Sequence, residues 1–341
     1  MQKNILTTLL NDMVSEKGHV TTIYYTAGDN HQQNTSNLEK IQKTLADKPT
    51  ILAQLNKVIN EQKINELRQV TVAIFITDSN NYFYQFDRLD IDSYVAKDTL
   101  PVLLPLLELK QSVPERIIVN LAYDQVDVYH VTENSIELLE AAEPLNISTI
   151  LGDQFRAGET NSRSMGDKQL AVHGHNASRE KKAAEHERFY RNVDAAVYAL
   201  IQEEHADLPI ILAGTPDNIS QYEDVSKQVS RNIDHNFQIR NQHNNMQDLY
   251  RAYKEATGQV NQQTAKYILT KANPKNVINA DYTKELALGD KQILIIRKNY
   301  FTLPAEQILA LSELGISAYK LKLPIYFIDT MDASANMIQV D

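Results

Sequence analysis

The sequence lacks cysteine entirely: none of its 341 residues is Cys. This absence excludes disulfide bonds, metal sites built on thiolates and nucleophilic thiols. No segment approaches the roughly 18 consecutive apolar residues that a membrane-spanning helix needs. The first 20 residues also lack the apolar core and the small-residue cleavage site of a secretory signal. We therefore expect a cytoplasmic protein without a membrane partner, and no motif points to a cofactor.

Positive charge is also in short supply. The chain has 34 Lys and Arg against 44 Asp and Glu, which gives a formal net charge of −10. An acidic chain binds nucleic acid poorly in general, so a DNA partner is not expected and any RNA contact must come from a local basic patch. The stretch 156–191 is such an exception, with eight basic and five acidic residues. A solvated loop and helix face is the alternative interpretation of this charge.

The first third of the chain alternates between strand and helix patterns. Residues 20–25 and 70–76 are rich in β-branched and aromatic residues, which predicts two buried strands, and 82–86 predicts a hairpin partner for the second. Between them, apolar residues at three-to-four spacing predict two helices over 38–59, separated at Lys48-Pro49. We expect Ser36 or Asn37 to cap the first helix, after a polar loop.

The second third predicts a hairpin, a long loop, a helix and a strand. The hairpin strands are 116–122 and 126–131, with a third strand over 136–139. An apolar stripe from Phe189 to Ile201 has helical period, and residues 209–213 predict a strand. A polar loop with little apolar content precedes that helix.

The last third again alternates helices and strands. Residues 231–247 are rich in Asn, Gln and His, which suggests a linker or an edge strand. The remaining predicted elements are a polar helix at 220–228, a helix at 249–272 interrupted at Gly258, a short helix at 283–288, a strand at 292–297, a helix at 304–314 ended by Gly315, and a strand at 324–329.

Together these patterns predict an α/β fold with three consecutive small α/β domains. We place the domains at residues 1–108, 109–225 and 226–341. The middle domain carries the long loop and the following helix over 154–204.

The order of these elements resembles the archaeo-eukaryotic peptide-chain release factor and Pelota superfamily, in the divergent branch found in bacteria. Four stretches carry the resemblance: V-T-T-I-Y-Y (20–25) with V-T-V-A-I-F-I (70–76); the hairpin R-I-I-V-N-L-A-Y-D-Q-V-D-V-Y-H-V (116–131); the helix H-E-R-F-Y-R-N-V-D-A-A-V (186–197) before P-I-I-L-A-G (209–214); and T-K-E-L-A-L-G-D-K-Q-I-L-I-I (283–296). The resemblance covers nearly the whole chain. It implies a third domain similar to the ribosomal-protein L7Ae-like domain of the family.

In that family a Gly-Gly-Gln tip in the middle domain assists hydrolysis of the peptidyl-tRNA ester. The matching positions here are Gly174, His175 and Asn176, so the first Gly is kept and the other two differ. Asn carries the same amide on a shorter stem, which makes Asn176 the candidate catalytic residue. His175 resists a conformation reserved for glycine. The motif is not intact, and family members without it act in ribosome rescue by binding. The bland alternative is that Asn176 or Ser178 only caps the helix.

Basic residues on the predicted helix are candidates for contact with ribosomal RNA phosphates. They are Arg179, Lys181, Lys182, Arg188 and Arg191. The alternative is pairing within the helix to Glu180, Glu185 and Glu187.

Two further site interpretations are weaker. His173, His175 and His186 lack a third ligand at a convincing spacing, so no metal site is expected. Asp124, Asp127 and Asp153 could suggest a carboxylate cluster, but Asp124 fits a hairpin turn better.

Three hypotheses of function follow. The first is a termination or rescue factor-like protein whose partners are the ribosome and tRNA. The second is a peptidyl-tRNA ester hydrolase that uses the Gly-His-Asn tip. The third is a protein-binding adaptor without RNA contact. The sequence does not indicate what recruits the protein or what its oligomeric state is.

Overall fold

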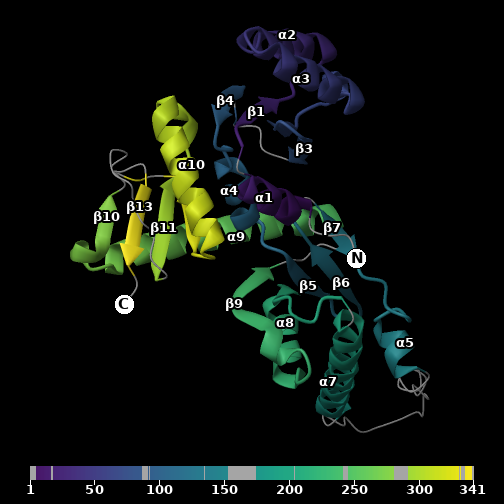
Figure 1. Ribbon diagram of the computed structural model, residues 1–341. Coiled ribbons are helices and arrows are strands. Elements are labelled where there is room, and N and C mark those ends of the chain that lie inside the picture. Colours follow the sequence, from purple (N-terminus) through teal and green to yellow (C-terminus); the bar gives the residue numbers. More distant parts are fainter. Residues whose placement is uncertain are drawn as a thin grey trace. The chain divides into compact units, whose positions relative to one another are not determined.

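The computed structural model describes residues 5–16, 18–86, 91, 93–133, 135–152, 174–202, 204–240, 245–279, 291–329, 331 and 335–339. These described residues form a mixed α/β structure in which the strands make three separate sheets (Figure 1). By its internal contacts the chain divides into two compact units. One is Val113–Thr257, and the other combines Gln2–Ser112 with Gly258–Asp341. In the described part of the chain, no helix is long and apolar enough to cross a membrane.

The first sheet has the strand order β3-β2-β1-β4, and its neighbouring strands are antiparallel. Its strands are β1 (Val20–Thr26), β2 (Thr71–Ile76), β3 (Asn81–Phe86) and β4 (Tyr94–Thr99). Successive side chains of a strand point to opposite faces. Ile23 accordingly packs with α2 (His31–Thr44) and α3 (Pro49–Glu61), whereas Tyr24 packs with α1 (Ile5–Ser15) and α4 (Leu104–Ser112). The predicted strands and the break at Pro49 are confirmed.

The start of α2 differs from the prediction. The helix begins at His31, because the Asn30 side chain caps it by accepting from the Gln33 N–H at 2.9 Å. Asn34, which made this segment look like a polar loop, is buried. Its Oδ1 accepts from the Tyr25 hydroxyl at 2.6 Å and from the Gly28 N–H at 2.7 Å. A buried polar side chain with its hydrogen bonds satisfied is compatible with a helix packed on a sheet.

The second sheet has the order β7-β6-β5-β8-β9. Its strands are β5 (Arg116–Leu121), β6 (Val126–Val131), β7 (Ile136–Leu138), β8 (Ile210–Gly214) and β9 (Ile233–Arg240). β5, β8 and β9 are parallel, whereas β6 and β7 are antiparallel to their neighbours. One face packs against α5 (Ile147–Leu151), α7 (Gly174–Ile201) and α8 (Pro216–Val225). The other face packs against the first half of α9 (Met246–Lys271).

Of the two alternatives for residues 231–247, an edge strand is the one observed over Ile233–Arg240. β9 pairs with β8 in parallel, with a register shift after the pair Ile210 and Ile233. The second sheet therefore extends past residue 225. The division into three domains at 108 and 225 stays a prediction.

The third sheet has the order β10-β13-β11-β12. Its strands are β10 (Val277–Asn279), β11 (Gln292–Arg297), β12 (Ile325–Ile328) and β13 (Ala335–Gln339), and α10 covers Ala305–Lys320. The predicted helix at 283–288 lies outside the described residues. Short 3-10 helices occur at Ile64–Glu66, Ser230–Asn232, Pro274–Asn276 and Tyr300–Thr302.

Two glycines were predicted to interrupt or end helices, and neither does. α9 continues through Gly258, where an added Cβ would meet nothing within 4 Å. α10 continues through Gly315, where an added Cβ would lie 3.0 Å from Leu107 Cδ1. Gly315 therefore lets α10 approach α4 closely, and its small size has a packing reason instead of a helix-stop reason.

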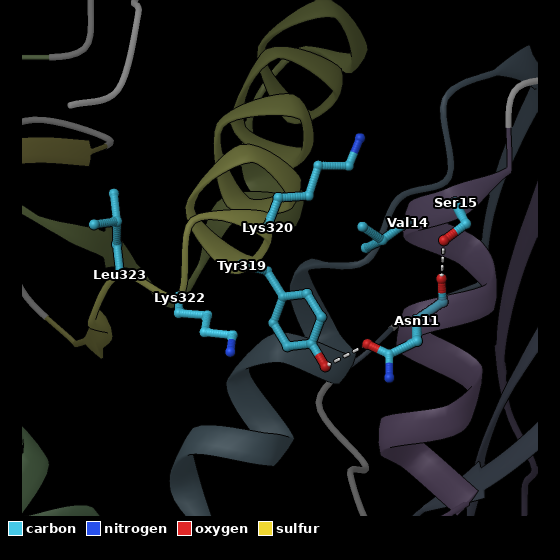
Figure 2. A pocket seen from close by; sticks show the side chains of 7 residues that line it. All are labelled: Asn11, Val14, Ser15, Tyr319, Lys320, Lys322 and Leu323. Carbon is cyan, nitrogen blue, oxygen red and sulfur yellow. Dashed lines mark hydrogen bonds between the residues drawn. The ribbon is translucent and has the colours of Figure 1, made fainter. Parts of the chain in front are cut away.

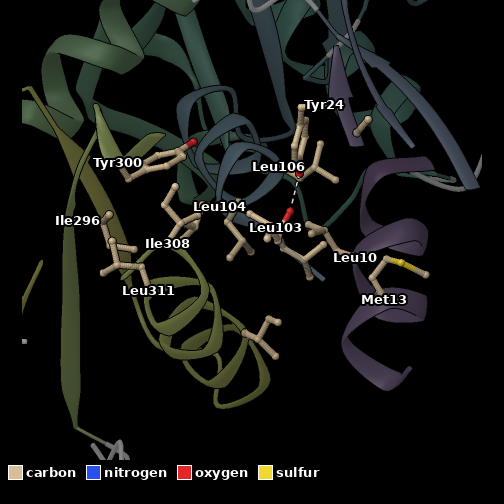
Figure 3. Close-up of a cluster of buried hydrophobic side chains, with 14 of the residues drawn as sticks. Leu10, Met13, Tyr24, Leu103, Leu104, Leu106, Ile296, Tyr300, Ile308 and Leu311 are labelled. Atoms are coloured by element: carbon tan, nitrogen blue, oxygen red, sulfur yellow. Dashed lines mark hydrogen bonds between the residues drawn. The ribbon is translucent and has the colours of Figure 1, made fainter. Parts of the chain in front are cut away.

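One apolar cluster joins the beginning and the end of the chain within the second unit (Figure 3). Leu10 from α1 and Leu104 from α4 belong to it together with Ile308 and Leu311 from α10. Tyr24 belongs to the same cluster, is fully buried and donates its hydroxyl hydrogen to the Val102 carbonyl at 2.7 Å. Burial of such side chains supplies the main stabilisation of this unit.

Candidate functional site

The helix α7 lies on the second sheet through a continuous apolar stripe. Phe189, Tyr190, Val193, Val197 and Ile201 are each 0–1% exposed and pack in the cluster that also contains Val119 and Leu212 of the sheet. The spacing of three and four residues places these side chains on one face of a helix. The predicted stripe is confirmed, and it fixes which face of α7 is turned to solvent.

The helix begins at Gly174, so the backbone of Gly174, His175 and Asn176 forms its first turn. Neither Asn176 nor Ser178 is the N-cap, because both lie inside the helix. Of the loop expected at 154–173, nothing lies within the described residues. The side chains of 174–182 also lie outside them, so the roles of Gly174, His175, Asn176, Arg179, Lys181 and Lys182 stay predictions.

The basic residues Arg188 and Arg191 are exposed on the solvent face of α7. Arg191 forms an ion pair with Glu187, one turn before it, with the two side chains 61% and 48% exposed. The intrahelical pairing considered for this helix is therefore present at Arg191. Exposed pairs of this kind contribute about 0–1 kcal/mol, so an RNA phosphate can compete with the carboxylate.

His186 anchors the N-terminal half of α7 to two other elements. Its Nε2 lies 2.6 Å from the Tyr123 carbonyl oxygen, in the turn between β5 and β6, and its Nδ1 lies 2.7 Å from Gln221 Oε1 on α8. The imidazole also stacks on the Tyr123 ring, with centroids 4.5 Å apart and an angle of 17°. Both ring nitrogens are thus occupied by protein atoms. The side chain is 3% exposed, and the arrangement assigns His186 a positioning role instead of a ligand role.

Asp194 ties the middle of α7 to the segment that follows α8. Its carboxylate is buried and accepts from Ser226 Oγ at 2.7 Å, the Lys227 N–H at 2.9 Å and the Gln228 N–H at 2.8 Å. The neighbouring Tyr222 hydroxyl also points at it, and burial together with this carboxylate raises the pKa of Tyr222. A buried carboxylate that accepts several N–H and O–H bonds is a structural group, not a free base.

The carboxyl ends of β5 and β8 meet at the start of α8. Gly214 ends β8 with φ +153°, and an added Cβ there would lie 2.6 Å from the Leu121 carbonyl oxygen. Thr215 caps α8, and Asn218 donates its Nδ2–H to the Leu121 carbonyl at 3.1 Å. This explains why the predicted Gly-Thr-Pro turn leads directly into a helix.

Asp124 lies in the β5–β6 turn, as the hairpin interpretation predicted. The turn is closed by Leu121 pairing with Val126 and by the Ala122 N–H donating to the Gln125 carbonyl at 2.9 Å. Asp153 lies outside the described residues. Across the described ranges, no group of three or more His, Asp or Glu side chains is arranged to hold a metal ion.

A pair of histidines, one on β6 and one in the segment between α7 and β8, was not anticipated from the sequence. His130 on β6 and His205, after α7, have ring centroids 4.4 Å apart, and His130 Nε2 lies 2.9 Å from Glu115 Oε1. Burial, followed by the nearness of His130, lowers the pKa of His205, against the opposing effects of Glu204 and Glu115. The two histidines come from positions 75 residues apart, so no local pattern could have revealed the pair.

Comparison with known proteins bears on this unit. Residues 116–259 match the family model described as bacterial archaeo-eukaryotic release factor family 6. The matched range nearly coincides with the compact unit Val113–Thr257, and it contains α7, α8 and the whole second sheet. No curated protein matches the chain by sequence.

Several solved structures also align with the chain, at low identity and low TM-score. The archaeal translation termination factor aRF1 is 11% identical over 100% of this chain and 99% of its own, with a TM-score of 0.27. Pelota from Archaeoglobus fulgidus is 10% identical over 98% and 92%, with a TM-score of 0.34. Dom34 from S. cerevisiae is 12% identical over 79% and 80%, with a TM-score of 0.33. Because these scores are low, only the family match bears on function.

Proposed function

We propose, from the match of residues 116–259 to the model of bacterial archaeo-eukaryotic release factor family 6, that this protein binds the ribosome as a translation termination or rescue factor. The family match is the observation that carries the proposal. The expected partners are the ribosome and tRNA, and the expected compartment is the cytoplasm. Binding, and not hydrolysis, is the proposed activity, because the Gly-Gly-Gln tip is replaced by Gly174-His175-Asn176.

The construction of α7 supports this proposal. His186 and Asp194 fix the helix to the β5–β6 turn and to the segment after α8, so its solvent face is held in a defined direction. Arg188 and Arg191 lie on that face. In an acidic protein, a rigid helix with exposed arginines favours contact with a phosphate backbone, since Arg matches phosphate geometry with two parallel N–H donors.

Co-sedimentation of the full chain with purified ribosomes tests the proposal. We expect the wild-type protein to pellet with ribosomes and the double variant Arg188→Glu/Arg191→Glu to remain largely in the supernatant. A matched control is Arg251→Glu, because Arg251 forms a similar exposed ion pair, with Asp248, on α9 in the same unit. Absence of the wild-type protein from ribosomal fractions, including stalled ribosomes, would refute ribosome binding. Recovery of a protein partner without RNA would favour the adaptor hypothesis instead.

A release assay addresses the hydrolase alternative. Wild-type protein and Asn176→Ala are compared for release of a peptide from peptidyl-tRNA on the ribosome. Release that is lost in the variant would assign hydrolysis to Asn176. We expect no release above background from either protein, because two of the three tip residues differ from the family motif.

A further inference from the structure

A small groove of about 260 Å³ lies between α1 and the edge strand β3, in the unit that does not contain α7. Its lining residues are Ile5, Thr8, Leu9 and Asp12 from α1 and Tyr82 and Phe83 from β3. The four helix residues are three or four positions apart, so they share one face of α1. Ile5 is 70% exposed although it is a large apolar side chain. The volume lies below the roughly 300 Å³ at which small-molecule pockets begin, so the groove suits one or two side chains of a longer ligand.

The outer edge of β3 carries backbone groups that are not used in the sheet. Among the described residues, β3 pairs with β2 alone. The Thr77 N–H donates to the Asn80 carbonyl at 3.0 Å where the hairpin turns, and bonded and non-bonded pairs alternate along the strands from there. Every second residue of β3 therefore turns its N–H and C=O away from β2. These residues are Asn81, Phe83 and Gln85.

These outward groups match an extended polypeptide. Each of the three residues offers one donor and one acceptor, and consecutive members of the set are about 7 Å apart along the strand. A second extended chain satisfies the donors and the acceptors together, as in the addition of a peptide strand to a sheet edge. Phosphate groups offer acceptors alone, so a nucleic-acid backbone would leave the outward C=O groups unpaired.

The two edges of this sheet differ in how they resist such pairing. β4, at the opposite edge, carries Lys97 and Asp98, and its pairing with β1 has a register shift. Charged residues and bulges are the usual means by which edge strands avoid a further partner. β3 has the sequence NYFYQF, without charge or proline, and pairs regularly with β2 along its whole length. Its edge is therefore suited to accept another strand.

Contacts on the other side of α1 hold the wall of the groove in place. The Lys110 ammonium of α4 donates to the Thr7 hydroxyl at 2.6 Å. Figure 2 shows the side of α1 that faces the end of α10, where the Tyr319 hydroxyl donates to Asn11 Oδ1 at 3.2 Å. Leu10 and Met13 are buried in the core shared with α4. A groove that is formed before binding loses less free energy to ordering when a ligand enters.

Asp12 indicates the chemistry of the occupant. It is exposed, and it is the one charged residue among the six that line the groove. A carboxylate beside apolar walls favours a segment that combines an aliphatic side chain with Lys or Arg. A second copy of this chain fits less well, because β3 has no basic residue to meet Asp12 and two chains of net charge −10 repel each other.

We propose that the edge of β3 binds an extended segment of a partner protein as an added strand, with an aliphatic side chain of the segment in the groove and a Lys or Arg side chain against Asp12. Both side chains lie on the same face of the segment, so an odd number of residues separates them. The site goes beyond the proposed ribosome binding, because it lies in the unit without α7 and its occupant is a polypeptide.

Backbone methylation tests the strand pairing. The probe is a labelled peptide of about eight residues, near the usual length of a strand, in which Thr alternates with Leu and one Leu position is replaced by Lys. Two further peptides carry N-methyl groups, one on the Thr nitrogens and the other on the nitrogens between them. We expect the full chain to bind the unmethylated peptide and one methylated peptide, and to bind the other at least about tenfold more weakly, since only every second N–H of an added strand faces β3. Equal affinity for the two methylated peptides would overturn the proposal.

Variants of the chain test the groove by fluorescence anisotropy. Asp12→Lys should weaken binding of the Lys peptide about threefold to tenfold and strengthen binding of a matched peptide with Glu in place of Lys. Ile5→Ala should weaken both. The matched control is Val260→Ala, because Val260 is also an exposed apolar helix residue of this unit, at 39% exposure, and lies on α9. It should leave affinity unchanged, and neither exposed position should shift the thermal midpoint appreciably.

Three results would contradict the proposal. The first is the absence of saturable peptide binding by the wild-type chain up to about 1 mM. The second is equal affinity of wild type and Asp12→Lys for the Lys and Glu peptides. The third is a dimer in sedimentation equilibrium that Ile5→Ala dissociates, since it would assign the edge of β3 to a second copy. Ribosome co-sedimentation should be unchanged in Ile5→Ala, so failure of the proposed ribosome binding and failure of this site are distinguishable.

Discussion

The His186 ring of α7 lies flat against the Tyr123 ring, and the same imidazole contacts the Tyr123 backbone carbonyl through Nε2 at 2.6 Å. Tyr123 itself is 58% exposed and lies in the turn from β5 to β6, whereas His186 is 3% exposed. The pair connects α7, whose first turn carries the predicted tip residues, to the turn between β5 and β6.

Replacing His186 by Ala should destabilise the protein by about 3 kcal/mol, because the change empties a buried site and leaves the Tyr123 carbonyl without its donor. Urea unfolding followed by circular dichroism measures the effect. His235→Ala is the control: that ring is 58% exposed and pairs with Glu223 at the surface. It should change the free energy of unfolding by less than about 0.5 kcal/mol. Equal effects of the two substitutions would contradict the anchoring role of His186.

Asp194→Ala should cost about 3 kcal/mol, since three backbone N–H groups lose their buried acceptor, those of Lys227 and Gln228 on Oδ2 and that of Val229 on Oδ1. Asp194→Asn should cost less, about 1–2 kcal/mol. Its remaining carbonyl can still accept from the Lys227 and Gln228 N–H groups while its NH2 meets the Ser226 hydroxyl, so only the Val229 N–H loses its acceptor. Hydrogen exchange at Lys227 and Gln228 gives a local readout. Asp207→Asn, at an exposed position, serves as the reference. An Asp194→Ala variant with an unchanged free energy of unfolding would contradict the role of Asp194 as a buried acceptor.

The lowered pKa of His205 leads us to expect that the protein is less stable in mild acid. Its folded-state pKa lies below the usual value of 6.5, so below that pH the unfolded chain binds more protons than the folded one. The free energy of unfolding therefore falls as the pH is lowered through this range, and the stability is fully present above it. Urea midpoints at about pH 7.5 and about pH 5.5 should differ more for wild type than for His205→Asn. An unchanged pH dependence in the variant would show that other groups dominate.

Two glycine substitutions should change the stability of the protein in opposite directions. Gly214→Ala places a Cβ against the Leu121 carbonyl oxygen in a conformation with φ +153°, and should cost about 3 kcal/mol or more. Gly258→Ala lies within α9 with open space around it, and should stabilise the protein by about 0.5–1 kcal/mol. Thermal unfolding distinguishes the two. A stabilising Gly214→Ala would mean that the close approach of β5 and β8 is not maintained.

The sequence predicted elements best where apolar residues are dense. The strands β1, β2, β5 and β8 consist largely of aliphatic, β-branched or aromatic residues that are buried on both faces, so composition alone identifies them. β4 and β13 were missed because their sequences, YVAKDT and ANMIQ, are weak as strands. Their conformation comes from pairing with β1 and with β10 and β11. A strand imposed by its neighbours leaves little trace in local propensity.

α1 shows a different kind of omission. The helix buries four apolar residues at helical spacing, which are Leu6, Leu9, Leu10 and Met13. Because α1 is only 11 residues long, this periodicity is too short to predict a helix from the sequence. The residues of the candidate site also differ in how far they could be predicted from the sequence. The stripe on α7 was predictable from period alone, whereas the partners of His186 lie 63 and 35 residues away in the sequence. Contacts over such separations depend on the fold and have no local pattern.

The discontinuous unit has a consequence for how the chain folds during synthesis. Leu6 and Leu10 near the beginning share one core with Ile308 and Phe327 near the end, so this core cannot close until almost the whole chain has left the ribosome. Residues 113–257 have their own core and can fold earlier. We expect the apolar face of α1 to stay exposed until α10, which follows nearly 300 residues later in the chain, has been synthesised. A nascent chain released before α10 emerges would expose that face and be prone to aggregation.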